Sequence, residues 1–511
     1  MSKAAKATIV LMIATILAKV LGFGRELVLA SAYGASMYSD AYITAMNIPI
    51  VIFATIGATL ATVLIPMYFE VDNELGKNES LKFINNIFNI VVIMCAILGI
   101  LGVIFTEPIV NIFAVGFEGE TYRIAVNFTR ITIIGIIFTG LSYLMTAYLQ
   151  IKNNFIIPGM MSIPKNIIIV VSTILSVKYS PYIMIWGTLL GMASEFLFQL
   201  PYAIKDGYTY KPYINLKDKY IKKITWLIIP VLIGVAVNQI NTMVDRTLAS
   251  TLAEGSVSAL NYANKLNGFV MALFITSIGT VIYPMLSKLS TENNKEEFIN
   301  SVVRAINSVI LLVIPVSVGA IVLASPIVKL LFERGEFDTR ATSMTAIALI
   351  MYSIGMIAFG LRDILGKVFY AIQDTKTPMI NGAIAMIMNI ILNFILVRYL
   401  QIAGLALATS ISAIICIFLL FNNIKKKIGY FGQDKIVRVT LKSLLSAIIM
   451  GIITYLMHNS LIGLLGTSFI QELIALFVSI SIGSIVYGGL IIVLKVEEIY
   501  IISNMIKRKI N

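Results

Sequence analysis

Charged side chains occur inside several of the long apolar stretches of this sequence, where a charge is unfavourable. A charge near the middle of a bilayer costs at least about 2.5 kcal/mol on insertion scales, so each one indicates a functional site. These positions are Lys19, Arg25, Glu26, Asp40, Asp245, Arg246, Lys265, Arg362, Asp363 and Lys367. Most of them are cations, and cations that share one cavity favour an anionic ligand.

The cations Lys19, Arg25 and Lys265 predict a site for a pyrophosphate group. Arginine binds such a multi-oxygen anion through two parallel hydrogen bonds, and lysine neutralises it as a point charge. Arg362 and Lys367 belong to the same predicted substrate-binding set. Pairing with a nearby opposite charge is the alternative for each of these residues. It explains Lys367 equally well, because Asp363 stands one helical turn before it.

A second group of residues offers oxygen ligands. Asn389 and Asn393 stand one helical turn apart, Thr409 lies in the next apolar stretch, and Asp245 supplies a carboxylate. Sodium, a hard cation, prefers such ligands, so these four residues predict a coupling-ion site. Hydrogen bonding between buried helices explains the same residues equally well. With one His and two separated Cys, no zinc site or other cofactor is expected.

The helices that position these residues are predicted from composition. Of the 511 residues, 58% are hydrophobic and only 13% are charged, which is unlike a soluble domain. Apolar runs of roughly 20 residues or more, the length that crosses a bilayer, recur along the whole chain. The sequence therefore predicts an all-α polytopic membrane protein with about fourteen transmembrane helices. The predicted spans are 7–32, 38–68, 83–113, 122–150, 156–178, 181–204, 221–250, 256–287, 302–331, 340–371, 379–399, 402–424, 438–458 and 470–495.

Lysine and arginine gather in alternate loops between these spans. The basic loops contain Lys77 and Lys82, Lys152, Lys205 to Lys223, Lys288 and Lys295, Lys376, and Lys425 to Lys427. The positive-inside rule places these loops, and both termini, in the cytoplasm. Because topology explains the net charge of +13, nucleic acid is not expected as a partner.

The basic, tyrosine-rich stretch 205–220 separates six predicted spans from the rest. We predict an N-lobe at 1–204, this stretch as a cytoplasmic linker, and a C-lobe of six spans at 221–427. The lobes resemble each other, since Gln150 and Gln373 each precede, by the same separation, an Asn followed by Ile-Ile. This pattern favours a parallel repeat in which two bundles enclose a central site. Chance similarity between apolar segments is the alternative.

Six segments carry a family resemblance. They are Lys19-Val-Leu-Gly-Phe-Gly-Arg25-Glu26, Ser39-Asp40-Ala41-Tyr42, Tyr262-Ala-Asn-Lys265-Leu, Leu331-Phe-Glu-Arg-Gly-Glu-Phe-Asp338, Phe369-Tyr-Ala-Ile-Gln-Asp374-Thr-Lys-Thr-Pro378 and Gly404-Leu-Ala-Leu-Ala-Thr409. Together they resemble the lipid II flippase MurJ (MviN) family of the multidrug/oligosaccharidyl-lipid/polysaccharide (MOP) exporter superfamily. The resemblance runs from the first predicted helix to the twelfth.

The resemblance implies two six-helix lobes in a V shape around a cationic central cavity, and a lipid-tail groove formed by two further helices within 428–511. By motif position it assigns Arg25, Glu26 and Asp40 to the substrate site. Lys19 and Lys265 stand where arginine is usual in the family. Lysine keeps the charge but loses the planar fork, so binding of pyrophosphate there should be less specific.

A larger departure from the family follows Asn47-Ile-Pro49. Many members carry a pair of arginines and then an acid in this region, whereas this chain has Phe53, Ala54 and Ala58. The absent pair weakens the predicted cationic entrance and keeps open a sister function, the flipping of another undecaprenyl-pyrophosphate-linked glycan, as by a Wzx-like flippase.

The function that the resemblance implies is alternating-access flipping of lipid II, the undecaprenyl-pyrophosphate-linked disaccharide-pentapeptide, across a bacterial cytoplasmic membrane. A coupling ion, Na⁺ or H⁺, or the membrane potential, worth about 2.3 kcal/mol per charge per 100 mV, would drive it. A multidrug or cation antiporter of the superfamily would favour an acidic, aromatic cavity instead. An enzyme is not expected, because the sequence has no Asp-x-Asp metal pair and no large extracytoplasmic loop.

Overall fold

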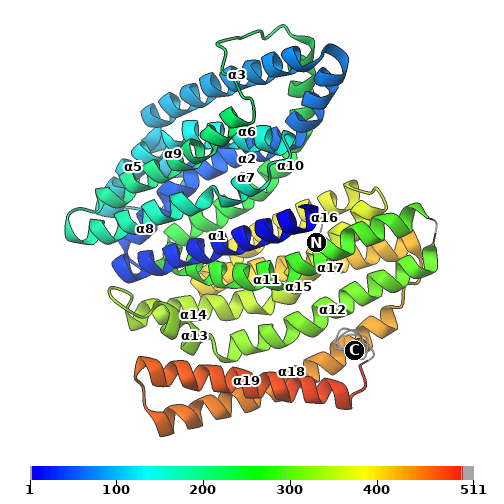
Figure 1. Cartoon of the computed structure of the whole chain (residues 1–511). Coiled ribbons are helices and arrows are strands. Elements are labelled where there is room, and N and C mark those ends of the chain that lie inside the picture. The colour runs from blue at the N-terminus through cyan, green and yellow to red at the C-terminus, as the bar shows by residue number, and fades with distance from the viewer. Residues whose placement is uncertain (1–2, 293, 497, 499–511) are drawn as a thin grey trace. The chain divides into compact units, whose positions relative to one another are not determined.

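The computed structural model describes residues 3–292, 294–496 and 498, with side chains at all of these except 3–13, 52, 54–62, 229–238, 273 and 276–277. This part of the chain forms α-helices joined by turns and loops, with no β-strand in it (Figure 1). In order, the helices are α1 Lys3–Tyr33, α2 Met37–Leu75, α3 Lys77–Ile104, α4 Thr106–Phe113, α5 Gly119–Thr132, α6 Gly135–Ile151, α7 Ile156–Met160, α8 Ser162–Lys178, α9 Tyr182–Lys205, α10 Lys219–Ser250, α11 Ser256–Thr291, α12 Lys295–Val322, α13 Ala324–Phe332, α14 Thr339–Ile354, α15 Met356–Ala371, α16 Lys376–Leu400, α17 Ile402–Ile428, α18 Gln433–Leu465 and α19 Phe469–Val493. The all-α prediction is confirmed.

Many of these helices are long and apolar enough to cross a membrane. Eight segments qualify by length and composition: α3, α7 with α8, α9, α12, α16, α17, α18 and α19. Two bent pairs, α5 with α6 at 42° and α14 with α15 at 45°, bring the number to ten if each pair is one span. The helices α1, α2, α10 and α11 have 31, 39, 32 and 36 residues, and only part of their side chains is described. The exact number of fourteen spans stays a prediction.

The helices form two compact units. Unit 1 comprises Met1–Ser258 and Arg334–Asp338, and unit 2 comprises Ala259–Glu333 and Thr339–Asn511. Within unit 1, α10 packs against α2 and α4, α1 packs against α8, and α6 packs against α2 and α9. Within unit 2, α12 packs against α14, α15 and α18, and α16 packs against α17. The predicted N-lobe, linker and C-lobe boundaries stay predictions.

The order of helix types occurs twice along the chain. A 28-residue helix (α3, α12) is followed by a short helix (α4, α13), a bent pair, a tight turn and two more candidate spans, α7 with α8 and then α9 in the first case, α16 and α17 in the second. The two turns have the same backbone, since φ is 59° at both Asn153 and Gln373, and the next residue donates to the carbonyl five positions earlier in each. This recurrence supports the predicted repeat. It pairs Gln373 with Asn153, three residues away from the predicted partner Gln150.

Three asparagines on α3 hold the segment between α9 and α10 in unit 1. Asn85, Asn86 and Asn89 are all buried. The amide of Asn86 donates to the Asn215 carbonyl at 2.9 Å and accepts from the Asn215 N–H at 2.8 Å. Asn85 accepts from the Lys211 N–H at 2.9 Å, and Asn89 donates to the Lys211 carbonyl at 3.0 Å. The segment that was predicted to be a linker is therefore bound to α3 through its backbone.

A cationic pocket between α1 and α8

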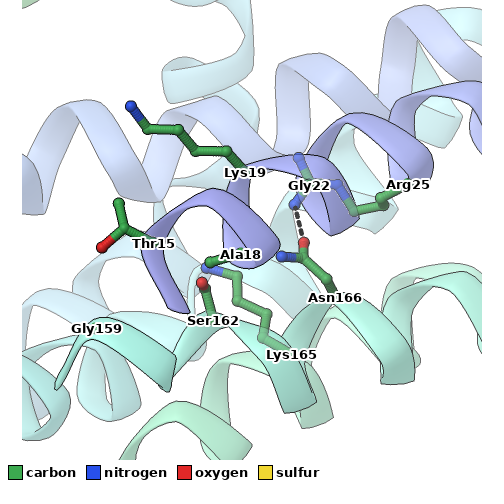
Figure 2. Close-up of a pocket in the computed structure, with 9 residues that line it drawn as sticks. All are labelled: Thr15, Ala18, Lys19, Gly22, Arg25, Gly159, Ser162, Lys165 and Asn166. Atoms are coloured by element: carbon green, nitrogen blue, oxygen red, sulfur yellow. Dashed lines mark hydrogen bonds between the residues drawn. The ribbon is translucent and has the colours of Figure 1, made fainter. Parts of the chain in front are cut away.

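A pocket of about 390 Å³ lies in unit 1 where α1 passes α7 and α8, and it is large enough for a small anionic group (Figure 2). Helix α1 contributes two of the predicted site residues, Lys19 and Arg25. The full lining is Thr15, Ala18, Lys19, Gly22, Arg25, Gly159, Ser162, Lys165 and Asn166. Three cations and polar groups from two helices thus line one cavity.

The guanidinium of Arg25 is oriented from two sides. Its Nη2 lies 2.6 Å from Oε1 of Glu26, and its Nη1 donates to Oδ1 of Asn166 on α8 at 3.4 Å. The side chain of Glu26 is only 6% exposed and that of Arg25 is 16% exposed, so both partners of this ion pair are largely withdrawn from solvent. Gly22 lies beside Asn166, because a Cβ there would be in ordinary contact with its Nδ2 at 3.8 Å.

Lys165 is a third cation of the pocket, and the predicted substrate-binding set lacks it. Its Nζ lies 3.2 Å from Oε1 of Glu195 on α9. Gly191, one turn before Glu195, makes room for the lysine, since a Cβ there would lie 3.3 Å from Cγ of Lys165. The sequence does contain a signal for both charges, because Lys165 and Glu195 fall within the predicted spans 156–178 and 181–204, where charge is costly.

Lys19 differs from the other two cations in its surroundings. Lys19 is an exposed residue of unit 1, and Figure 2 shows that its side chain is directed away from Arg25 and Lys165. It has no ion pair in the part of the chain that the structure describes. Its ammonium group is therefore not neutralised by a carboxylate in the described part of the chain.

Asp40 does not line this pocket. One carboxylate oxygen accepts from the N–H and the hydroxyl of Ser258 at 2.7 and 2.6 Å, and the other accepts from the Gly255 N–H at 2.8 Å. Asp40 thus caps the N-terminus of α11 within unit 1. These contacts favour a structural role in this conformation, and its assignment to the substrate site stays a prediction.

The Arg-Gly-x-Phe-Asp motif also contacts α1. The Glu336 N–H donates to the Ser31 carbonyl at 3.0 Å. Gly34 and Gly335 both have φ near +60°, and a Cβ on either would lie 2.2 Å from a backbone oxygen, of Glu336 and Ser31 respectively. Only glycine fits both positions, so this part of the family resemblance has a packing explanation.

The absence of a basic pair after Pro49 has a local structural counterpart. Phe53 is fully buried, its ring stacks on Tyr143 with centroids 6.2 Å apart, and it packs closely on Gly140. Ala54 and Ala58 lie outside the described side chains. At Phe53, this chain has core packing where the family comparison predicts a region of basic residues.

The predicted cations of unit 2 have separate environments. Lys265 is an exposed residue of α11. Lys367 pairs with Asp363, one turn earlier on α15, at 2.5 Å, and Gly279 of α11 leaves room for its ammonium group. Arg362 lies over the ring of Phe359 at 5.8 Å on the same helix. The local pairing that the sequence offered as an alternative for Lys367 is therefore present.

Three of the four residues predicted to bind a coupling ion come together in unit 2. Asn389 donates to the hydroxyl of Thr409 at 3.3 Å, and Asn393 donates to Oδ1 of Asn389 at 3.0 Å. Both asparagines are buried. Asp245, the predicted carboxylate ligand, lies on α10 in unit 1. The inter-helix hydrogen bonding offered as an alternative is present, and the ion site stays a prediction.

The Asp-Thr-Lys-Thr-Pro motif forms the turn before α16. The carboxylate of Asp374 forms an ion pair with Lys427 at the end of α17 and accepts from the Thr377 N–H at 3.0 Å. Burial alone would raise the pKa of Asp374, but the hydrogen bonds from Lys427 and Thr377 outweigh it and lower the pKa to about 2. This motif ties α16 to α17.

Long helices that recur in the same order, with a cationic pocket between two of them, define a polytopic membrane transporter with a polar ligand site. The family model described as lipid II flippase MurJ matches residues 29–476, and the chain belongs to that family.

Relatives and solved structures agree with this assignment. The probable lipid II flippase MurJ of Vibrio cholerae is 32% identical over 438 residues, which cover 82% of this chain and 82% of that protein. The lipid II flippase MurJ of Burkholderia cenocepacia is 28% identical over 424 residues, which cover 81% and 82%. A solved structure, lipid II flippase MurJ in an inward closed conformation, matches with a TM-score of 0.81 at 30% identity, covering 94% of this chain and 98% of that one. An inward-facing MATE multidrug resistance transporter of the MOP superfamily shares the fold, with a TM-score of 0.64 at 15% identity and coverage of 82% and 98%.

Proposed function

We propose that this protein moves lipid II from the inner to the outer leaflet of a bacterial cytoplasmic membrane, with both termini in the cytoplasm. The observation that carries the proposal is the pocket lined by Lys19 and Arg25 of α1 and by polar groups of α8, in a chain of the lipid II flippase MurJ family. The cargo is expected to change sides without any covalent bond being made or broken.

The pyrophosphate of the cargo is the group that suits this pocket. The guanidinium of Arg25, held by Glu26, presents further N–H donors to phosphate oxygens, and Lys19 adds a mobile point charge. We propose that Lys265, Arg362 and Lys367 bind the same substrate at other stages of transport. Asp40 is assigned to the contacts between helices at those stages. The polyprenyl tail stays in lipid, where α18 and α19 are the proposed groove.

Alternating access requires two conformations that bind the headgroup from opposite sides. Repeated cycling needs a driving force, and we propose a coupling ion, Na⁺ or H⁺, at Asp245 with Asn389, Asn393 and Thr409, or the membrane potential. Unchanged sodium and pH dependence of transport in Asp245→Ala would remove the ion site from this scheme.

A depletion experiment tests the cargo. The native lipid II flippase is depleted in a bacterium that depends on it, and this chain is expressed in its place. We expect growth and the appearance of lipid II at the outer surface. If the chain reaches the membrane in normal amount and lipid II stays inside, lipid II is not its cargo. Rescue of a strain that lacks the flippase of another undecaprenyl-pyrophosphate-linked glycan would then favour the sister function.

A further inference from the structure

Lys165 faces the same cavity as Lys19 and Arg25 but comes from a different helix. In Figure 2 its side chain extends from α8 toward α1, beside Ser162. Its side chain is 20% exposed, and that of its partner Glu195 is 10% exposed. A lysine so placed is neutralised by the carboxylate before a ligand binds, which avoids the cost of an unpaired charge at a largely buried position.

The pocket has more cations than carboxylates around it. Three cations, Lys19, Arg25 and Lys165, stand against two carboxylates, Glu26 and Glu195. The excess positive charge suits an anion with charge on each of two phosphates. The two ion pairs also differ, because Arg25 has donors left over after its contact with Glu26, whereas a lysine carries only one compact ammonium group.

We infer that Lys165 is a further pyrophosphate-binding residue of this pocket, and that Glu195 controls how much of its charge the ligand receives. The inference rests on the proposed function, since it concerns the same pocket. When pyrophosphate enters, the ammonium group turns from Glu195 toward a phosphate oxygen, and the flexible lysine stem allows this without movement of α8. Glu195 is the positioning residue, because it competes with the ligand for Lys165.

A purely structural ion pair between α8 and α9 makes a different prediction. If the pair only joined the two helices, loss of either partner would disturb the pocket in the same direction. Competition predicts opposite signs: Lys165→Ala weakens pyrophosphate binding, while Glu195→Gln strengthens it, because the lysine is then released to the ligand. The sign of the Glu195→Gln effect therefore separates the two accounts.

The experiment measures binding of inorganic pyrophosphate to the purified full-length protein in detergent by titration calorimetry. We expect the dissociation constant to rise about tenfold in Lys165→Ala and to fall several-fold in Glu195→Gln, each a modest free-energy change. The double variant Lys165→Ala/Glu195→Gln, which leaves no unpaired charge, should bind as weakly as Lys165→Ala. Lys178→Ala, on the exposed end of α8, is the matched control and should bind as the wild type does.

Several outcomes would overturn the inference: no binding of pyrophosphate by the wild type, wild-type binding by Lys165→Ala, or weakening by Glu195→Gln equal to that by Lys165→Ala. Lipid II translocation by the wild type in vesicles is measured in parallel. If the wild type does not move lipid II but the opposite signs appear, the proposed cargo is wrong and the pyrophosphate site stands. If it moves lipid II and Lys165→Ala binds pyrophosphate normally, only the role of Lys165 is wrong.

Discussion

The guanidinium of Arg25 lies 2.6 Å from the carboxylate of Glu26, the next residue along α1. Adjacent residues on a helix normally point in different directions, so this contact requires the arginine to fold back over the helix surface. The result is a largely buried cation that is neutralised and oriented before any ligand arrives, with Asn166 as a second acceptor at 3.4 Å. Such preorganisation lowers the cost of binding an anion.

Replacing Arg25 should therefore affect transport more than its charge alone suggests. Arg25→Ala is expected to lower the rate of lipid II translocation in vesicles by at least about tenfold, the effect of losing a charged hydrogen bond. Arg25→Lys should restore only part of the rate, because lysine lacks the planar fork. Arg123→Ala, which removes an exposed arginine of α5, is the control. A wild-type rate in Arg25→Ala would exclude this arginine from the headgroup site.

The paired glycines at Gly34 and Gly335 give a prediction about stability. Gly34→Ala places a Cβ 2.2 Å from the Glu336 carbonyl oxygen at a backbone φ of +60°, so the chain must shift. We expect a loss of about 1 to 3 kcal/mol in the free energy of unfolding, seen as a lower melting temperature in detergent. Gly24→Ala is the matched control, since a Cβ there meets no atom within 4 Å. Equal melting temperatures for both variants would contradict the packing described for the Arg-Gly-x-Phe-Asp motif.

The low pKa of Asp374 predicts a dependence of stability on pH. A carboxyl whose pKa is about 2 in the folded protein and about 3.9 when unfolded stabilises the fold above pH 4, and the contribution is lost as pH falls toward 2. Asp374→Asn should therefore melt below the wild type at pH 7, and the gap should close as the pH is lowered through this range.

Lys427, the partner of Asp374, tests the same contact from the other side. Its side chain is 43% exposed, so solvent screens the pair and Lys427→Ala should cost no more than about 1 kcal/mol at pH 7. Lys426→Ala, at the neighbouring exposed lysine, should have no effect.

The pH series also decides the role of the Asp374 charge. A difference in melting temperature between wild type and Asp374→Asn that is the same at pH 7 and pH 3 would show that the carboxylate charge does not stabilise this turn.

Features of the fold and of the site that depend on local composition can be predicted from the sequence. Apolar runs predicted the helices, and the cost of charge in lipid singled out Lys19 and Arg25, which do line one pocket. The same rule applied to span 156–178 leads to Lys165, which the predicted set omitted. Bends are harder to predict, because the break between α14 and α15 at Gly355 leaves the apolar pattern of span 340–371 continuous.

Partners far apart in the sequence could not be predicted. Asp40 has the composition of a ligand-binding residue, yet its hydrogen bonds reach Gly255 and Ser258, more than two hundred residues away. Asn85 and Asn89 appear in the sequence only as polar residues near the start of an apolar span, whereas in the fold they bind the backbone of the segment before α10. Such contacts depend on packing, which composition and periodicity do not specify.

The central claim is that this protein moves lipid II through a pocket that binds its pyrophosphate. The most direct measurement is the translocation of labelled lipid II across vesicles that contain only the purified protein, with inorganic pyrophosphate as competitor on the side of entry. The account predicts that the wild type moves lipid II, that pyrophosphate inhibits this movement, and that Arg25→Ala lowers its rate by at least about tenfold. Translocation that is unchanged by both pyrophosphate and Arg25→Ala would contradict it.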